Sequence, residues 1–389
     1  MAFKMKKQII ILGNGFDLAC GLKSRYADFF KNRFEKLFGK KDHDEIRKAL
    51  TNEDELKQSV NIKKDYFAEV ANKYNNENIT RWDIIFLFAE KYMNNEQENW
   101  NDIENMISKI ITIAADPYGE GYSFHDTAME KIVRMFSGSS DTDESGDRER
   151  IKVLFHSLLA FEKVFSNYIY DQVSNNKEFI SKANDLLNKL IKYKGKNDRV
   201  DIISFNYSLN ESTKRFLPAN INSWTNIHGV AGYDKLSMKN FFSKNSQNIV
   251  DTIPSPVFGI DNHDIKNSND LRISFTKSYR LLNNNINNIR SKVDYTGTDL
   301  ITIYGHSLGR ADYSYFETLF DLNNMYNSNT VLQYYYYPGS NEIESRQKYT
   351  KLLMNLLTEY GLSLSNIHGE NIVNKLILEQ RIEILPTNN

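Results

Sequence analysis

The sequence lacks the features that several classes of protein require. Its single cysteine, Cys20, cannot form an intrachain disulfide or a cysteine-based zinc cluster, and it suits a reducing cytoplasm. The 49 basic and 50 acidic residues nearly cancel, so the overall charge gives no signal for nucleic acid or an anionic membrane. No apolar run approaches the ~20 residues that span a bilayer, and Gly13 interrupts the first run. These absences predict a cytoplasmic globular protein without a signal peptide or a membrane span.

What is present suffices to build a buried core, since 389 residues include 23 tyrosines and 23 phenylalanines. Short apolar runs that are rich in β-branched residues and end at glycine or asparagine are typical of strands in a parallel sheet. Helical patterns follow the last two runs, and strands that alternate with helices indicate an α/β fold. The predicted strands are 8–12, 200–205, 225–227, 257–260, 300–304 and 331–337, and the helices after them are 313–322 and 342–360.

The interval between the first two predicted strands is unusually long and reads as helical. Apolar residues recur there at helical spacing, with Lys, Glu and Asn between them. We therefore predict a Rossmann-like, mostly parallel sheet with helices on both faces, formed by residues 1–30 and 197–389, and a helical insertion over residues 31–196. The clearest helical segments within it are 67–74, 82–93, 103–114 and 151–170.

Two stretches predict irregular structure. Ser137–Asp147 is small, polar and acidic, and we predict a mobile loop there. Tyr233–Asp251 has no clear periodicity and predicts a loop or lid over the edge of the sheet.

The sequence ILGNGFDLACG, residues 11–21, places two glycines directly behind the first predicted strand. Gly13 lets the chain turn sharply, and Gly15 lets the backbone approach a phosphate at the next helix N-terminus. The third glycine of the dinucleotide fingerprint is missing, because Leu18 stands in its place. The turn therefore predicts a nucleotide site with part of its usual signature.

Three further residues of this turn carry side chains that could reach a ligand. Asp17 can bind a ligand or cap the following helix, and the sequence leaves both interpretations open. For Asn14 and Phe16 we favour ligand contact, because a structural turn needs neither an amide nor an exposed ring.

Two polar residues follow the next predicted strands. Asn206, followed by Tyr207, stands at the carboxyl end of a strand, where open α/β sheets bind ligands, and can hold ribose hydroxyls or a water. Closure of a turn is the competing interpretation for Asn206. His228 ends the next strand and can act as a general base, although a lone histidine is more often structural. Gly229 leaves backbone room beside it.

The segment 305–312, GHSLGRAD, follows the predicted strand that ends at Tyr304. It matches the Gly-x-Ser-x-Gly nucleophile elbow of α/β-hydrolases, with Ser307 as nucleophile. That fold places the elbow in mid-sheet, whereas only one convincing strand follows this segment. We prefer a turn that faces phosphate or ribose, with Gly305 amides and Ser307 as donors, Asp312 as ligand or cap, and His306 as a structural residue. Glu317, Asp321 and His368 lie downstream as triad partners for the hydrolase alternative.

The remaining histidines predict no metal site. His43 and His125 lie in polar surroundings and His156 lies on a predicted helix. None belongs to a His-x-x-x-His pair, which is a common arrangement of zinc ligands on a helix.

The four motifs, in this order, resemble the abortive-infection AbiH family of bacterial anti-phage proteins. The resemblance spans both ends of the chain and leaves most of the helical insertion uncovered. Each fragment is modest alone, and the ordered set is more specific. The matching pieces are GNGFDLACGLKSRYADF (13–29), SFNYS (204–208), NIHG (226–229), VFGID (257–261) and YGHSLGRADYSYF (304–316).

The family is in turn similar to sirtuin-like proteins, whose Rossmann-type domain binds NAD. That resemblance implies Asn206 and His228 as catalytic residues, with the turn 13–17 and Gly305–Ser307 around the cofactor. Asn14 and Phe16 stand where sirtuins carry small residues. Zinc-binding cysteines are missing, which argues against protein deacetylation. The implied activity is hydrolysis of NAD to nicotinamide and ADP-ribose, with NAD as substrate and no metal.

Three classes of function follow. The leading one is an effector that consumes NAD when a phage-derived trigger or partner protein is sensed, and the resemblance implies a homo-oligomer. The second is a module that binds NAD or another adenine nucleotide without turnover, with the helical insertion contacting a partner. The third is a serine hydrolase that uses Ser307.

Overall fold

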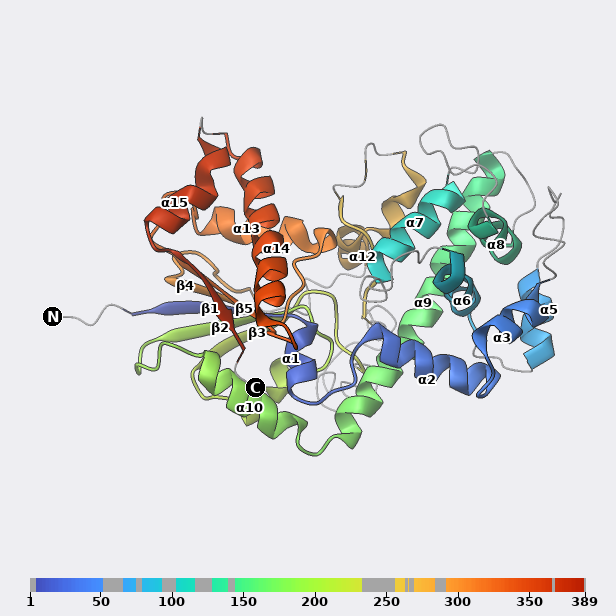
Figure 1. The fold of residues 1–389 in the computed structure, drawn as a ribbon, viewed down its shortest axis with the longest axis horizontal. Helices are drawn as coiled ribbons and strands as arrows, with labels where there is room; N and C mark the ends of the chain where they lie inside the picture. Colours follow the sequence, from blue (N-terminus) through green and yellow to red (C-terminus); the bar gives the residue numbers. More distant parts are fainter. Residues whose placement is uncertain are drawn as a thin grey trace, which may run out of the picture. The chain divides into compact units, whose positions relative to one another are not determined.

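The chain folds into two compact units. The sheet unit comprises residues 1–24, 169–254 and 284–389, and the helical unit comprises residues 25–168 and 255–283. The domain boundaries expected after residue 30 and before residue 197 stay a prediction. The computed structural model, drawn in Figure 1, describes residues 5–51, 66–74, 79–92, 103–115, 128–138, 144–232, 256–262, 265, 269–283, 292–365 and 368–387.

The sheet unit is built around six strands that all run parallel, in the order β3-β2-β1-β4-β5-β6. This is the strand order of dinucleotide-binding Rossmann domains. The predicted α/β fold is therefore confirmed. The strands are β1 (Lys7–Leu12), β2 (Arg199–Ser204), β3 (Ile221–Asn226), β4 (Leu300–Tyr304), β5 (Val331–Tyr336) and β6 (Ile382–Pro386).

Three segments differ from the strand prediction. The apolar run 257–260 does not join the sheet, and only Ile260 forms an isolated bridge, to Thr276, within the helical unit. β6 was not predicted, because this edge strand is only partly buried and its sequence IEILP has no continuous apolar run. β3 begins earlier than the predicted 225–227, because its first half, INS, is mostly polar.

Helices cover both faces of the sheet, as Figure 1 shows. In β1, Ile9 and Ile11 pack on one face, and Ile10 and Leu12 pack on the other, because successive side chains of a strand alternate. The first face lies against α13 (Tyr313–Leu322), α14 (Glu342–Ser363) and α15 (Ile372–Leu378), and the second lies against α1 (Asn14–Ala19) and α10 (Phe179–Leu190).

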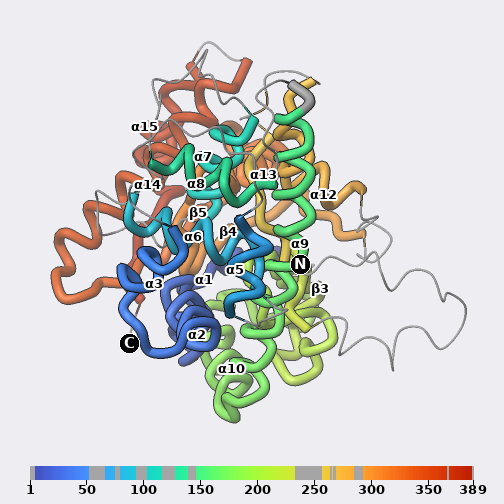
Figure 2. The backbone as a smooth tube through the Cα atoms, turned by 90° about the vertical axis from the view of Figure 1, so that its right-hand side faces the viewer, coloured from blue at the N-terminus to red at the C-terminus, as the bar shows by residue number. Residues whose placement is uncertain are grey.

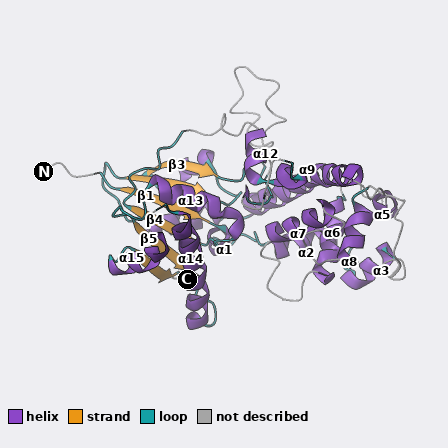
Figure 3. Ribbon diagram, turned by 90° about the horizontal axis from the view of Figure 1, so that it is seen from above, coloured by secondary structure: helices purple, strands orange, loops and turns teal. Residues whose placement is uncertain are grey.

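The helical unit contains no strand among its described residues, and Figure 3 shows the described strands gathered in the sheet unit. Helix α8 contacts both α6 and α7, and Figure 2 shows the three helices close together. The predicted helical segment between β1 and β2 is confirmed. Its helices are α2 (Tyr26–Phe38), α3 (His43–Leu50), α5 (Tyr66–Tyr74), α6 (Arg81–Tyr92), α7 (Ile103–Ala115), α8 (Ala128–Phe136) and α9 (Glu144–Asn175), and η5 (Leu271–Phe275) and α12 (Lys277–Asn283) complete the unit.

The two predicted irregular stretches have different outcomes. Residues 144–147 of the acidic stretch form the first turn of α9, where a loop was predicted, and residues 139–143 lie outside the described part of the chain. Residues 233–251, the predicted lid, also lie outside it. In the described helices, none combines the length and apolar character that a bilayer crossing requires.

Charged side chains inside the helical unit are matched with opposite charges. Glu162 and Arg280 form an ion pair in which both side chains are 2% exposed. Arg33 forms a two-point contact with Asp83, with Nε and Nη2 at 2.9 and 2.8 Å from the two carboxylate oxygens. Buried charges persist in proteins when they are paired and hydrogen-bonded in this way.

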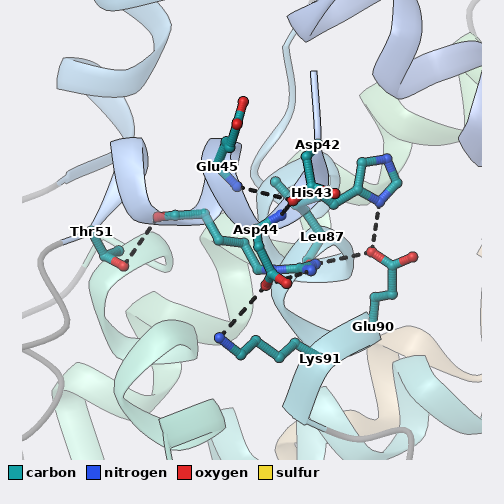
Figure 4. A network of polar contacts seen from close by, with 9 residues as sticks. Asp42, His43, Asp44, Glu45, Thr51, Leu87, Glu90 and Lys91 are labelled. Atoms are coloured by element: carbon teal, nitrogen blue, oxygen red, sulfur yellow. Dashed lines mark hydrogen bonds and ion pairs between the residues drawn. The ribbon is translucent and has the colours of Figure 1, made fainter. Parts of the chain in front are cut away.

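A polar network joins α3 to α6 (Figure 4). Arg47 donates to the Leu87 carbonyl at 2.7 Å and to Glu90 Oε2 at 2.9 Å. His43 Nδ1 lies 2.8 Å from the same Glu90 oxygen. Asp42 caps α3 by accepting from the first backbone N–H groups of the helix. His43 therefore has a structural partner in the helical unit, remote in sequence from the motifs of the sheet.

Candidate active site at the carboxyl edge of the sheet

The carboxyl ends of four parallel strands lie side by side in the sheet unit. β1 pairs with both β2 and β4, and β2 pairs with β3. The segments that follow these strands therefore meet at one edge: 13–17, 205–208, 227–229 and 305–312. The strand order reverses between β1 and β4, which is the point where open α/β sheets bind ligands.

The turns after β1 and β4 pack backbone against backbone. The amide of Gly13 donates to the Tyr304 carbonyl at 3.0 Å, and the amide of Gly15 donates to the Gly305 carbonyl at 2.8 Å. A Cβ at Gly13 would lie 2.4 Å from His306 Cα. Gly305 has a φ of 66°, which side-chain-bearing residues rarely adopt. The glycines thus permit close approach of the two turns. The amides of Gly13 and Gly15, at the turn where the sequence suggested a phosphate, already donate to carbonyls.

The structure corrects the expectation that the Phe16 ring is exposed. Its ring is buried in the core beneath the sheet and meets Tyr304 edge to face, with ring centroids 6.3 Å apart. An apolar ring one turn into α1 points back to the sheet, because it gains more from burial than from solvent. Asn14 is exposed, and its side chain pairs with Ser24, whose Oγ donates to Asn14 Oδ1 at 2.5 Å.

Asp17 lies in the first turn of α1 and does not cap it. Its carboxylate is 2% exposed and accepts a hydrogen bond from Ser208 Oγ at 2.7 Å. Burial raises the pKa of Asp17 to about 7, while hydrogen bonds from Ser208 and Asn206 act in the opposite direction. A carboxyl group at this edge therefore changes charge near neutral pH.

Asn206 connects the loop after β2 to the turn after β1. Its Nδ2 donates to the Gly13 carbonyl at 2.9 Å, and its side chain also hydrogen-bonds Asp17. Asn226, at the end of β3, holds the backbone of the same loop, since its Nδ2 donates to the Asn206 carbonyl at 3.0 Å and to the Leu209 carbonyl at 2.8 Å. Asn206 therefore closes the turn and also lies at the carboxyl ends of the strands. The two interpretations that the sequence offered for it do not exclude each other.

Two histidines meet one carboxylate at the same edge. His228 Nε2 lies 3.0 Å from Asp312 Oδ1, and His306 Nε2 lies 3.4 Å from Asp312 Oδ2. The His228 and His306 side chains are 3% and 4% exposed. Gly229, directly after His228, has a φ of 94°, so the glycine serves the turn. The fold joins three residues that the sequence presents separately.

Aromatic rings surround the two imidazoles. The Phe205 ring centroid lies 5.5 Å from that of His228 and 4.5 Å from that of His306. The Tyr315 ring lies 5.4 Å from His228. Apolar walls lower the local dielectric constant, which strengthens the contacts of the histidines with their carboxylate.

The motifs that meet at this edge belong to a known family. The sequence model described as bacteriophage abortive infection AbiH matches residues 9–334, from β1 into β5. The chain belongs to the AbiH family. It is thus an abortive-infection protein of anti-phage defence. Comparisons with curated proteins and with solved structures return no match.

One AbiH-like segment belongs to the helical unit rather than to the sheet unit. VFGID, residues 257–261, belongs to the helical unit, where the Phe258 amide donates to Glu162 Oε1 at 2.7 Å and its carbonyl accepts from Arg280 at 2.6 Å. A Cβ at Gly259 would lie 2.3 Å from the Phe275 carbonyl oxygen. This segment of the AbiH match therefore has a structural role in the described contacts.

The hydrolase alternative finds little support in the geometry of the AbiH chain. Ser307 is exposed, and within the described residues no hydrogen bond joins its Oγ to a histidine. Of the predicted triad partners, Asp321 accepts from Tyr360 at 3.1 Å, and His368 precedes the short turn before α15. No group of three or more potential metal ligands comes together in the part of the chain that the structure describes.

Several residues of the edge were not singled out by the sequence. Ser208 lies in the loop after β2 and Asn226 is the last residue of β3, and single-sequence patterns do not distinguish such short polar residues from ordinary turn residues. Arg310 is an exposed cation between Ser307 and Asp312. Tyr207, which the sequence did single out, is half-buried beside Asn206, and its contact with a ligand stays a prediction. The tandem SFNYS and NIHG motifs were the signal that could have drawn attention to Ser208 and Asn226.

Proposed function

We propose that this AbiH-family protein binds NAD at the carboxyl edge of β1–β4 and hydrolyses it to nicotinamide and ADP-ribose. The observation that carries the proposal is the convergence of buried His228, Asn206 and Asp17 on the strand ends of a sheet with dinucleotide-binding order. The resemblance to sirtuin-like proteins supports the choice of NAD among nucleotides. Depletion of NAD would then stop phage growth by stopping the metabolism of the host cell.

The chemistry of the reaction assigns a task to each group. The bond between ribose and nicotinamide breaks with its electron pair on the pyridine nitrogen, so neutral nicotinamide leaves and positive charge develops on the ribose. Water adds to the anomeric carbon and loses a proton, which His228 accepts as general base, a role typically worth ~10²–10⁴-fold in rate. The products are nicotinamide, ADP-ribose and one proton.

Asn206 and Asp17 are the groups that orient the sugar in this proposal. An ionised Asp17 can only accept hydrogen bonds, so the amide nitrogen of Asn206 faces it and the Gly13 carbonyl. The amide oxygen Oδ1 is the atom that accepts from a ribose hydroxyl. The partly developed charge on the ribose is stabilised by the Asp17 carboxylate in its ionised form.

The diphosphate is assigned to the turn after β4. Because the Gly13 and Gly15 amides bind carbonyls, phosphate contacts fall to exposed groups of segment 305–312. Ser307 offers a hydroxyl and Arg310 a guanidinium, and both side chains are exposed. The resulting site takes the anionic part of NAD at its exposed end and the ribose at its buried end.

The test is incubation of the purified protein with NAD, with and without lysate of phage-infected cells, and chromatographic measurement of nicotinamide and ADP-ribose. We expect equal amounts of the two products, and a loss of about 10²–10⁴-fold in His228→Ala. Asn206→Ala should lose activity as well. His156→Ala, which changes an exposed histidine of α9, is the matched control and should retain it.

The alternatives have separate signatures in the same experiment. NAD binding in calorimetry without product under any condition would identify a nucleotide sensor. Covalent labelling of Ser307 by a fluorophosphonate would identify a serine hydrolase. Equal activity of wild type and His228→Ala would contradict the proposed base.

A further inference from the structure

We propose that Asp312 and His306 are positioning residues that determine which ring nitrogen of His228 carries the proton. As a statement about catalysis the inference rests on the proposed function. As a statement about the tautomer of His228 it rests only on contacts within the sheet unit. Asp312 is the centre of the arrangement, since each of its two oxygens faces the Nε2 of one histidine.

The tautomer of His306 follows from its backbone contact. The Leu308 amide donates to His306 Nδ1 at 2.9 Å, so Nδ1 is an acceptor and the proton of the neutral ring lies on Nε2. That Nε2–H points toward Asp312 Oδ2 at 3.4 Å. The turn is held by Tyr334, whose hydroxyl donates to the His306 carbonyl at 2.8 Å, and Leu308 has a φ of 52° within it. His306 is therefore fixed in one tautomer and one orientation.

The tautomer of His228 follows from the carboxylate. An ionised carboxylate only accepts hydrogen bonds, so the His228 nitrogen at 3.0 Å from Asp312 Oδ1 must carry a proton. In neutral His228 the basic lone pair then lies on Nδ1. The protonated ring that forms when His228 accepts a proton keeps its contact with the negative charge of Asp312, which stabilises it.

The two histidines consequently have different tasks. The Leu308 N–H occupies the lone pair of His306 Nδ1, so this nitrogen is not available to accept a proton while the contact persists. His228 has no such conflict with its carboxylate. Phe205 lies beside both rings and Tyr315 lies beside His228, and their bulk opposes rotation of the His228 ring about its χ2 angle. Geometry therefore selects His228 as the base and His306 as its support.

The direct test is nitrogen-15 NMR of the full chain labelled at its seven histidines. The signal of His228 is assigned by its disappearance in His228→Gln. We expect wild-type His228 to show a protonated Nε2 and an unprotonated Nδ1. In Asp312→Asn the preference should be lost and both tautomers should appear, since an amide can donate as well as accept.

A matched pair of variants separates the contacts of His306. His306→Asn keeps an acceptor near the Leu308 amide and loses the donor to Asp312, whereas His306→Gln keeps a donor that reaches Asp312 and loses the local acceptor. We expect His306→Gln to retain the His228 tautomer and His306→Asn to weaken it. If NAD turnover is present, Asp312→Asn should lower kcat on the order of 10²–10⁴-fold with little change in KM.

The outcomes are distinguishable from failure of the proposed function. A wild-type His228 protonated on Nδ1, or an unchanged His228 tautomer in Asp312→Asn, overturns the inference whether or not NAD is cleaved. Loss of the tautomer preference in a protein that cleaves no NAD supports the positioning contact and contradicts only the proposed reaction. Thermal unfolding of each variant confirms that the fold is retained.

Discussion

The helical unit and the carboxyl edge of the sheet unit both bury charged side chains, but they satisfy them differently. In the helical unit three buried or partly buried ion pairs are described: Arg280 with Glu162, Arg33 with Asp83, and Lys277 with Glu104 at 2.7 Å. Such pairs join helices and leave no charge for a ligand. They are typical of structural contacts.

At the sheet edge the carboxylates have partners of another kind. Asp17 meets a hydroxyl and an amide, and Asp312 meets two imidazoles that are themselves titratable. The pKa of Asp17 lies near neutrality because desolvation exceeds the effect of its hydrogen bonds. Strongly shifted pKa values of buried groups are more frequent at functional sites than elsewhere in proteins. In the proposed function the charges at the sheet edge act on the substrate, whereas the ion pairs of the helical unit stabilise the fold.

The largest loss of stability is expected from a substitution in the helical unit. Glu162→Leu leaves Arg280 buried without its carboxylate, which should cost about 3–5 kcal/mol of unfolding free energy. Burial raises the pKa of Glu162 even though Arg280 acts to lower it, so the desolvation cost of the pair is substantial. Urea unfolding followed by circular dichroism measures the loss.

The double variant Glu162→Leu with Arg280→Met is its control. Removing both charges should cost less than removing Glu162 alone, because no unpaired charge is left in the core. If the double variant lost as much unfolding free energy as the two single variants together, the pair would not be a matched structural contact.

The second largest effect is expected at the sheet edge, where the stability of the protein should depend on pH through Asp17. The folded-state pKa of Asp17, about 7, lies above the ordinary 3.8, so the folded state binds the proton more tightly. The contribution of Asp17 to the free energy of unfolding is therefore most favourable below pH 4, and it is lost as pH rises toward 7. With ~1.4 kcal/mol per pKa unit, the full loss is up to about 4 kcal/mol.

Asp17→Asn removes this titration and keeps an acceptor for Ser208. Melting temperatures of wild type and variant should converge at low pH, and the variant should be the more stable protein at pH 8. A wild type whose stability rises between pH 4 and 7 relative to Asp17→Asn would show that the Asp17 carboxylate is stabilised by a cation, like those of the helical unit.

Sequence reasoning identified the strands that are buried on both faces. β1, β2 and β4 read as apolar runs because helices cover both sides of them, and β5 alternates buried and partly buried residues. The outermost strand β6 alternates partly buried and exposed residues, which resembles a loop in a single sequence. The run 257–260 is equally apolar, yet it is buried in the helical unit, and periodicity does not specify which core receives an apolar segment.

The sequence predicts which residues of the candidate site follow strands. It does not predict the contacts between residues that are far apart in the chain. Asn206 and His228 follow strands, so the rule for parallel sheets places them on one edge. The contact between His228 and Asp312 joins residues 84 positions apart, and nothing in either motif signals it. For Phe16 the sequence suggested an exposed ring because a structural turn does not need one, whereas the ring is buried against Tyr304.

The smallest change in stability is expected from a substitution at Ser307. This variant tests whether the exposed end of the site has a different role from its buried end. Ser307 is exposed and touches no histidine among the described residues, so Ser307→Ala should change the unfolding free energy by less than about 0.5 kcal/mol. In the proposed reaction its hydroxyl binds phosphate in ground and transition states alike, and KM for NAD should rise while kcat stays near wild type. A fall of kcat in step with that of His228→Ala would instead place Ser307 at the reacting atoms. The titratable groups of the sheet edge would then serve a serine nucleophile rather than a water molecule.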